Sequence, residues 1–332
     1  MLSLDTGYEI RIDGKISSAG TQLRVFAALI ERAIQKKEIS YAEFALDLNK
    51  HHVLKLLKLA ARFVPNILDE NTKAILALPD CIARIEILNK IYLACRILDD
   101  AIDGDSPRHL TADEILQLVN VSTQHLESEA WNPQSAVDIF LEKAMEGCRE
   151  IQLDIKSQVL AVLNSMEFDA KRRTDFMKTR VPKFYPESDL QTHYYQLDIE
   201  GTIGAMLNLL DEGNTEENKR ALEPLGKACR ILYDLQDLSK ETRDGLVNIS
   251  TEDAANFGIS IDSLSRWAGE KSDIRSAPEE IKAYSGQKVL EARKLLAEYN
   301  ILVDGADFKP LTRSILKRSY ENQCYGIIEK MS

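Results

Sequence analysis

Residues 95–103 read CRILDDAID, and residues 233–241 read YDLQDLSKE. Both stretches lie in segments where apolar residues recur at helical spacing, so both are predicted to be helical. Asp99 and Asp103 then lie one turn apart on one helix face. The second stretch places three acids on one face, at spacings of three and four residues: Asp234, Asp237 and Glu241. Stacked like charges repel one another, so these helices are expected to be compensated by a cation.

The two acidic faces indicate a function if they face each other across a helical bundle. Carboxylate oxygens from both helices would then form a cage suited to Mg²⁺ and a diphosphate. Mg²⁺ retains several of its waters, so one or two carboxylates per ion are enough. A single acidic motif is also typical of a solvated helix face, and the presence of a second motif favours the metal interpretation. The pair points to the chemistry of isoprenoid diphosphates.

Composition favours one large helical domain in a reducing compartment. The chain has 332 residues, 44% of them hydrophobic, and only 15 Gly and 9 Pro, which indicates long regular elements around a substantial core. Five scattered cysteines without a Cys-x-x-Cys pair predict neither disulfides nor a zinc site. The first residues lack a signal peptide, and no window of about 18 apolar residues occurs. We therefore expect a cytoplasmic protein without a transmembrane anchor.

The charge pattern excludes one class of partner and leaves another open. The formal net charge is −11 and no long basic run occurs, so no nucleic acid is expected to bind. An anionic substrate is compatible with this charge, because local arginines and bound metal can reverse the field inside a cleft. The sequence also lacks histidine pairs at metal-ligand spacing and a glycine-rich dinucleotide fingerprint.

Helical periodicity covers nearly the whole chain. The predicted helices span residues 21–37, 40–63, 80–102, 111–128, 135–163, 188–211, 216–243, 260–270, 277–300 and 310–331. We expect an all-α, single-domain helical bundle, with residues 1–68 as an N-terminal helical extension packed on a domain of residues 69–332. Gly201 and Gly204 lie inside a predicted helix, which indicates either close helix packing or a local break near a ligand.

The sequence resembles the squalene/phytoene synthase family of class I isoprenoid synthases over about residues 70–332. Five segments carry the resemblance: residues 92–103, Met166-Glu167-Phe168-Asp169, Tyr195 with Gly201-Thr202-Ile203-Gly204, residues 237–260, and the basic, tyrosine-containing last helix at residues 313–331. Each segment alone is weak, and together they are specific. The resemblance implies a bundle of the isoprenoid synthase type with a central active-site cavity.

The resemblance also implies roles for individual side chains. The expected metal ligands, for three Mg²⁺ ions held together with the diphosphate, are Asp99, Asp103, Asp234, Asp237 and Glu241. The side chains expected to bind the diphosphate are Arg96, Arg230 and Tyr233. Arg96 shares the helix face of Asp99, so an ion pair within the helix is the alternative. Tyr195 and Asp198 are the candidate catalytic residues: Tyr195 would orient a diphosphate or stabilise a cation, and Asp198 would accept a proton or bond Thr202 or a helix end.

Departures from the family pattern cluster around this expected site. Arg230 and Tyr233 stand where the family usually has glutamine and asparagine. Asp198 and Glu200 replace a tyrosine and a small residue, and Glu241 replaces an aspartate. These changes leave the class of chemistry in place and make the product harder to assign.

Two enzymatic functions and one non-enzymatic alternative follow. The first is head-to-head condensation of two C15 or C20 prenyl diphosphates to a squalene- or phytoene-type product, with NADPH required only for squalene. The second is a terpene cyclase that ionises a single prenyl diphosphate. A relative without activity is the third, although such a protein would be expected to lose its aspartates. In either enzyme the substrate is a prenyl diphosphate, and release of an apolar product is compatible with peripheral membrane contact.

Overall fold

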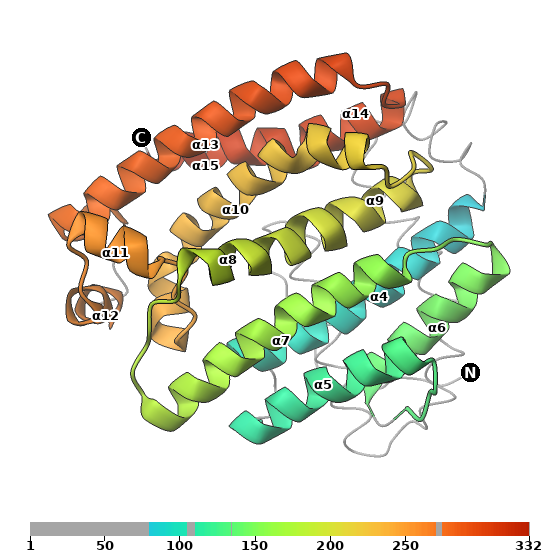
Figure 1. Ribbon diagram of the computed structural model, residues 1–332, viewed down its shortest axis with the longest axis horizontal. Coiled ribbons are helices and arrows are strands. Elements are labelled where there is room, and N and C mark those ends of the chain that lie inside the picture. Colours follow the sequence, from blue (N-terminus) through green and yellow to red (C-terminus); the bar gives the residue numbers. More distant parts are fainter. Residues whose placement is uncertain (1–79, 105–109, 134, 270–273, 332) are drawn as a thin grey trace, which may run out of the picture.

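The computed structural model describes residues 80–104, 110–133, 135–269 and 274–331, and these residues form a helical bundle (Figure 1). The predicted extension of residues 1–68 and its two helices lie outside the described residues. The first part of the bundle consists of α4 (Cys81–Asp103), α5 (Ala112–Ser128), α6 (Ala136–Glu150), α7 (Lys156–Thr179), α8 (Glu187–Tyr194), the π-helix η1 (Tyr195–Ile203) and α9 (Gly204–Leu209). The second part consists of α10 (Glu216–Asp244), α11 (Thr251–Phe257), α12 (Ile261–Gly269), the short 3₁₀ helix η2 (Ile274–Ser276), α13 (Glu279–Gly305), α14 (Pro310–Leu316), the π-helix η3 (Lys317–Glu321) and α15 (Asn322–Met331).

The all-α prediction is confirmed, and the predicted bounds are wrong in two places. The segment predicted as one helix at residues 135–163 is two helices, separated between Glu150 and Lys156, and the second of them extends to Thr179. Residues 164–179 were missed because several side chains on this part of α7 are polar and buried, which removes the amphipathic pattern. Helix α11 was also missed; Ser250 caps its first turn by accepting a hydrogen bond from the Asp253 backbone N–H at 2.9 Å.

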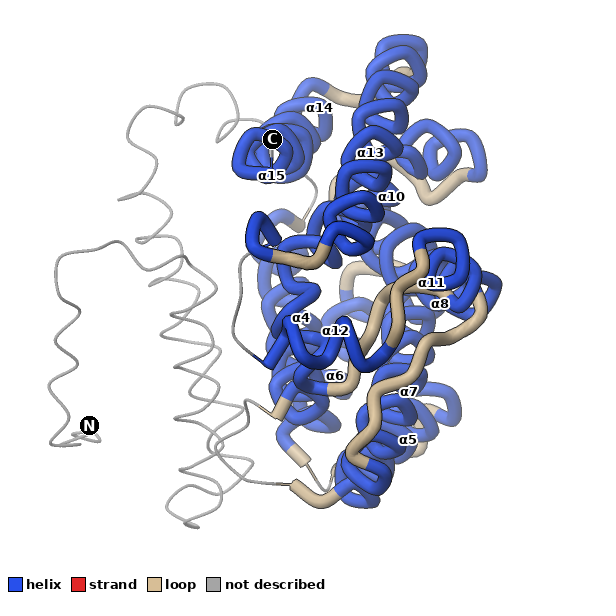
Figure 2. Tube along the Cα trace, turned by 90° about the vertical axis from the view of Figure 1, so that its left-hand side faces the viewer, coloured by secondary structure: helices blue, strands red, loops and turns tan. Residues whose placement is uncertain are grey.

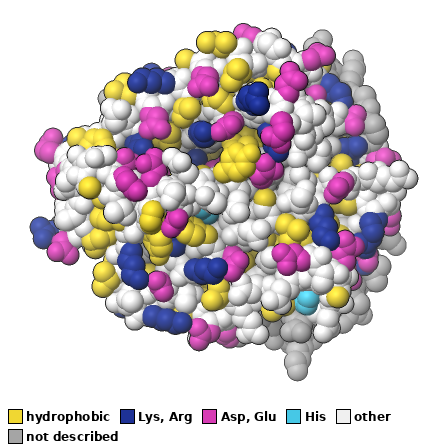
Figure 3. Space-filling model, viewed as in Figure 1, with side chains coloured by type: hydrophobic (Ala, Val, Ile, Leu, Met, Phe, Trp, Pro, Cys, Tyr) yellow, Lys and Arg dark blue, Asp and Glu magenta, His cyan; other side chains and the backbone are white. Residues whose placement is uncertain are grey.

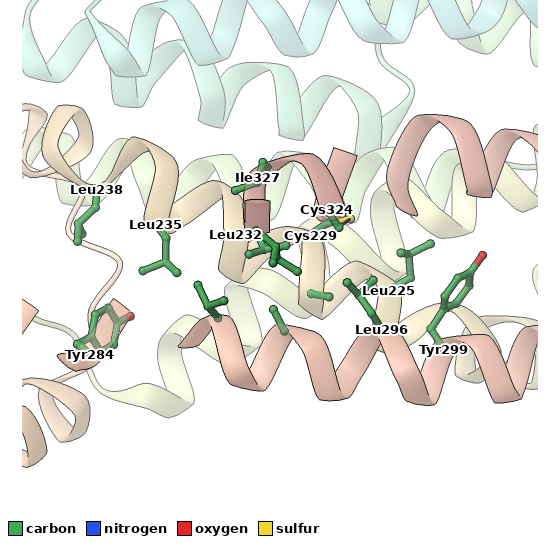
Figure 4. Close-up of a cluster of buried hydrophobic side chains, with 14 of the residues drawn as sticks. Leu225, Cys229, Leu232, Leu235, Leu238, Tyr284, Leu296, Tyr299, Cys324 and Ile327 are labelled. Carbon is green, nitrogen blue, oxygen red and sulfur yellow. Dashed lines mark hydrogen bonds between the residues drawn. The ribbon is translucent and has the colours of Figure 1, made fainter. Parts of the chain in front are cut away.

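Two apolar cores divide the bundle. Helices α4, α5, α6 and α7 surround one core, and α10, α12, α13 and α15 surround the other. Figures 1 and 2 both show the first group in one half of the molecule and α10, α13 and α15 in the other; in Figure 1 the segment from α8 to α9 runs between them. Figure 4 shows the second core where α10 packs against α13 and α15. The acidic segments of α4 and α10 therefore belong to different cores, and their polar faces meet at the boundary.

Two glycines let helices approach closely at this boundary. Gly245 ends α10 with φ +82°, and a Cβ there would lie 2.2 Å from Cγ of Phe176 on α7. A Cβ on Gly201 would lie 2.4 Å from Cγ2 of Val162 on α7. Gly201 therefore packs closely against α7 and also lies in the π-helix η1, while its proximity to a ligand stays a prediction.

In the described part of the chain, no helix is both long enough and apolar enough to cross a bilayer.

Candidate active site

On the first acidic helix, α4, the carboxylates are paired with cationic side chains. The Arg96 guanidinium donates to the carboxylates of Asp99 and Asp100 on its own helix, which is the intrahelical ion pair considered as an alternative. Asp103 accepts a hydrogen bond at 2.8 Å from Nζ of Lys240, which lies on α10. The two acidic helices therefore meet at the Asp103–Lys240 ion pair.

On the second acidic helix, α10, the three acids differ in burial and in hydrogen-bond partners. Asp234 is buried, and Nδ2 of Asn248 donates to its Oδ1 at 3.2 Å. The same amide nitrogen donates to Oε2 of Glu241 at 2.9 Å, so one neutral side chain bridges two carboxylates. Asp237 lies between them in sequence, and its side chain is exposed.

A buried arginine fixes the orientation of the Asn248 amide. Nη1 of Arg172 on α7 donates to Oδ1 of Asn248 at 2.9 Å and to the carbonyl oxygen of Val247 at 3.0 Å. Because Oδ1 is occupied by this donor, the NH₂ group of Asn248 must face the two acids. Nε and Nη2 of Arg172 donate to Asp169 at 3.1 and 2.5 Å. Arg172 thus connects α7 to the second acidic helix.

Asp169 continues this network toward the first acidic helix. His193 Nε2 lies 3.4 Å from its carboxylate, and His193 Nδ1 lies 2.7 Å from the Ser165 hydroxyl. Burial acts to raise the pKa of Asp169, but His193 and Arg172 together hold that pKa below its usual value. The Asp169 charge in turn contributes to raising the pKa of Asp99. A polar chain therefore runs from Asp169 on α7 through Arg172 and Asn248 to the acids of α10, and Asp169 acts on Asp99 of α4 only through its charge.

Arg230 joins the π-helix η1 to the second acidic helix. Its Nε and Nη2 donate to the two carboxylate oxygens of Asp198, each at 2.9 Å, and its Nη1 lies 3.5 Å from Oδ1 of Asp234. The guanidinium carbon also lies 5.4 Å from the centre of the Tyr194 ring. The alternative in which Asp198 bonds Thr202 is not realised, because the Thr202 hydroxyl donates to the carbonyl of Leu197. Asp198 is thus held beside Asp234 by a bidentate ion pair.

The two candidate tyrosines form hydrogen bonds with residues outside this network. The Tyr195 side chain is exposed, and its hydroxyl donates to Glu200 at 3.0 Å. The Tyr233 hydroxyl donates to Oε1 of Gln323 on α15. The structure therefore places Asp198 and Arg230 beside Asp234, and it joins α4 to α10 at the Asp103–Lys240 pair. Arg96 contacts only acids of its own helix among the contacts described. The exposed Asp237 acts on Glu241 through its charge, and Tyr195 lines the same pocket as Asp198.

Three acids of the two acidic helices carry raised pKa values. Burial, reinforced by Asp103, raises the pKa of Asp99 to about 6, although its side chain keeps 40% of its exposure and solvent weakens this effect. Burial raises the pKa of Asp234 to about 6 against the opposing effect of Arg230. Burial and the neighbouring Asp234 raise the pKa of Glu241 well above its usual value. At these three acids, burial therefore outweighs the effect of the neighbouring arginines on the pKa.

The donor chemistry fits Mg²⁺, while the side chains are not arranged as a ready metal centre. Residues 80–104, 110–133, 135–269 and 274–331 contain no group of three His, Cys, Asp or Glu side chains placed to hold an ion. Hard carboxylate oxygens with raised pKa values are nevertheless the ligands that a divalent cation stabilises in charged form. Arg96 and Lys240 currently occupy the positions of counter-ions at Asp99 and Asp103.

A pocket with a volume of about 900 Å³ gives access to the second acidic helix. It lies between α8–η1 and α13, and α10 contributes Arg230, Ile231 and Asp234 to its wall. Tyr194, at the end of α8, and Asp198, on η1, also line the pocket. Figure 3 shows this face of the molecule, where apolar side chains gather among acidic and basic ones. The Asp198–Arg230 pair is therefore part of a pocket wall.

Arg172, Asn248, Asp169 and Lys240 were not predicted as site residues. The signal for Asp169 was present, since it ends the Met166–Asp169 segment that carries the family resemblance. Asn248 lies in the downstream segment of the same resemblance. Arg172 and Lys240 had no sequence signal, because their contacts depend on how α4, α7 and α10 pack.

Comparisons with known proteins agree with this architecture. Residues 71–312 match the family model for squalene/phytoene synthase. The squalene synthase HpnC from Alicyclobacillus acidocaldarius has a similar structure, with a TM-score of 0.55 and 15% identity over 84% of this chain and 92% of that chain. A dehydrosqualene synthase in complex with ligand gives a TM-score of 0.50 and 15% identity over 85% and 97% of the two chains. No curated protein sequence matches the chain. The two solved structures confirm the isoprenoid synthase type of all-α fold.

Proposed function

The chain belongs to the squalene/phytoene synthase family, and we propose that it is a Mg²⁺-dependent prenyltransferase that joins two C15 or C20 prenyl diphosphates head to head. The observation that carries this proposal is the meeting of α4 and α10, where the Asp103–Lys240 ion pair bridges two acidic helix faces at 2.8 Å. Five carboxylates of these helices are available as ligands: Asp99, Asp103, Asp234, Asp237 and Glu241.

In the proposed reaction each group has a distinct task. Bound Mg²⁺ supplies Lewis-acid stabilisation of the departing diphosphate, which assists ionisation of the allylic carbon. Arg96 and Arg230 are forked donors suited to diphosphate oxygens, and Arg96 would exchange its present carboxylate partners for them. Asn248 orients the carboxylates of Asp234 and Glu241. NADPH would be consumed only if the product is squalene.

One observation supports cyclisation of a single prenyl diphosphate as a second candidate. The Asp198 carboxylate lines the pocket beside Asp234, held in place by both arms of Arg230. A fixed carboxylate near the substrate is a suitable acceptor for the proton that ends a cyclisation. In a cyclase, Asp198→Ala or Asp198→Tyr should change the product mixture, because proton removal follows local geometry.

Product mass separates the two candidates. Purified protein is incubated with Mg²⁺ and one isotopically labelled C15 or C20 diphosphate, and the hydrocarbons are analysed by mass spectrometry. Condensation predicts a product with the carbons of two chains, or the cyclopropyl diphosphate intermediate, and EDTA should stop its formation until Mg²⁺ is restored. A terpene with the carbons of one chain would overturn condensation in favour of cyclisation. Absence of any product with either substrate would indicate the non-catalytic alternative.

A further inference from the structure

Two cysteines from distant parts of the chain lie against each other in the second core. Sγ of Cys229 on α10 is 3.2 Å from Sγ of Cys324 on α15, although 95 residues separate them in sequence. Both side chains are buried, with 7% and 1% of their surface exposed. Figure 4 shows the two side chains side by side where α10 faces the last helix. A disulfide requires sulfur atoms about 2.05 Å apart, so a shift of roughly 1 Å would allow one to form.

Neighbouring contacts hold the two helices at this separation. Tyr233 lies one turn after Cys229 on α10, and its hydroxyl donates to Gln323, the residue before Cys324. The apolar side chains of Leu232 and Ile327 belong to the same buried cluster. The two sulfur atoms therefore meet within a packed helix pair, where no large rearrangement is needed to join them.

We propose that Cys229 and Cys324 form a redox-sensitive pair, which hydrogen peroxide converts into an intramolecular disulfide joining α10 to α15. The proposal concerns a modification site and does not depend on the proposed enzymatic function. It also differs from the expectation drawn from the sequence, which predicted no disulfide because the cysteines are odd in number, scattered and without a signal peptide.

The contact between the thiols assigns a different task to each sulfur. A hydrogen bond from the Cys229 thiol lowers the pKa of Cys324, and the same contact raises the pKa of Cys229. The Cys324 thiolate would attack one oxygen of the peroxide, the O–O bond would break, and hydroxide would leave and take up the proton that Cys324 released. The Cys229 sulfur would then attack the sulfenic sulfur of Cys324 and expel its hydroxyl group, which leaves as water with the Cys229 proton. Two thiols are oxidised to one disulfide, and one peroxide is reduced to two waters.

Burial determines which oxidants can reach the pair. Both sulfur atoms lie in an apolar core, so a reagent must enter through local opening of the helix pair. Hydrogen peroxide is close to water in size, whereas low-molecular-weight disulfides are much larger. We therefore expect peroxide to form the cross-link faster than oxidised glutathione at equal concentration.

Counting thiols tests the proposal directly on the full chain. Reduced protein is treated with hydrogen peroxide in its folded state, unfolded in excess alkylating reagent, and weighed by mass spectrometry. The untreated protein should take up five labels, and the treated protein three, with a cross-linked Cys229–Cys324 peptide after digestion. The treated protein should also unfold several degrees higher than the reduced protein, since the cross-link closes a long loop. Added dithiol should reverse both changes.

Two variants locate the cross-link. Cys324→Ser should lose no pair of labels, whereas Cys148→Ser, which removes a buried cysteine from the other core, should still lose two of its remaining labels. The proposal is overturned if peroxide leaves five reactive thiols in folded wild-type protein, if oxidation stops at sulfinic acid on one cysteine, or if the linked peptide contains another pair. The wild-type measurement decides the matter even if Cys324→Ser fails to fold.

Discussion

The carboxylates of the two acidic helices have different kinds of partner. On α4, Arg96 neutralises Asp99 and Asp100, and Lys240 reaches across from α10 to neutralise Asp103. On α10, the main partner of Glu241 and Asp234 is a neutral amide, that of Asn248, with Arg230 at 3.5 Å from Asp234 as the nearest cation.

This difference shows where a metal would be attracted most. The Asn248 amide does not neutralise Asp234 and Glu241, and burial raises the pKa values of both, so their charged forms lack compensation. The pKa of Asp99 is also raised, but Asp99 and Asp103 already contact protein cations, with which a metal there must compete. We infer that α10 supplies the stronger attraction and that α4 completes the site once Arg96 and Lys240 turn to the diphosphate.

The largest effect is expected from removing one charge at either helix. Asp237→Asn and Asp99→Asn should each lower turnover of a prenyl diphosphate by about 10²-fold or more, because charge at the leaving group is left unshielded. Both variants should fold normally, since each replaces a carboxylate by an amide of the same shape. Asp113→Asn is the matched control, because Asp113 is exposed on α5 and pairs only with a surface lysine among the contacts described. Near-normal turnover of Asp237→Asn at saturating Mg²⁺ would contradict the assignment.

The second-largest effect is expected from replacing Asn248, whose amide donates to two carboxylates of α10. Asn248→Leu keeps the side-chain volume but leaves Asp234, Glu241 and one donor of Arg172 without their partner. The free energy of unfolding should fall by about 2–4 kcal/mol in chemical denaturation, because buried charged groups lose hydrogen bonds. Asn218→Leu, at the start of the same helix, removes bonds to two backbone carbonyls and should change the free energy of unfolding by about 1 kcal/mol or less. Equal losses in the two variants would remove the special role given to Asn248.

A pH series measures the uncompensated charge on α10. The folded pKa of Asp234 is about 6, above the value of about 3.9 in an unfolded chain, so the folded state binds this proton more tightly. The resulting stabilisation is fully present below pH about 4 and is lost as the pH rises through about 6. Without metal, the unfolding free energy of wild-type protein should therefore fall relative to that of Asp234→Asn by about 1–3 kcal/mol between pH 4 and pH 7. Parallel curves, or a rise, would show that the charge of Asp234 is already compensated.

The smallest effect is expected at the ion pair that joins the helices. Lys240→Met removes the partner of Asp103, and the Lys240 side chain is 41% exposed, so stability should change by about 1 kcal/mol or less. With Asp103 freed for metal, the Mg²⁺ concentration for half-maximal activity should fall by about fivefold or less. Lys227→Met removes an exposed ion pair on the same helix and should leave this concentration unchanged. A higher Mg²⁺ requirement in Lys240→Met would mean that the lysine assists the site.

Much of the fold was accessible from periodicity, and each exception has its own physical cause. The helix predicted at residues 216–243 is α10, because its apolar positions face a large core. The end of α7 was missed because Arg172 is buried there in an ion pair with the half-buried Asp169, and in sequence such a charged pair looks like a solvated surface. Short α11 was missed because its helical signal is a single cap at Ser250.

The site was accessible from sequence only as a set of helix faces. Spacing placed Asp99 and Asp103 on one face, but it could not indicate that Lys240 would reach Asp103 from another helix. Asp198 and Arg230 were both candidates, yet their bidentate contact depends on the π-helical turn that carries Asp198. Contacts between residues distant in sequence follow from helix packing, which a single sequence does not specify.

Binding of inorganic diphosphate tests the joint action of the two helices most directly. Isothermal titration calorimetry of the full chain would compare diphosphate binding with and without Mg²⁺ in wild-type protein, Asp99→Asn and Asp237→Asn. We expect binding to wild-type protein only when Mg²⁺ is present, and a loss of about tenfold or more in affinity for each variant, because each helix supplies part of the metal cage. Binding that is equally tight without Mg²⁺, or that is unchanged in either variant, would contradict the account.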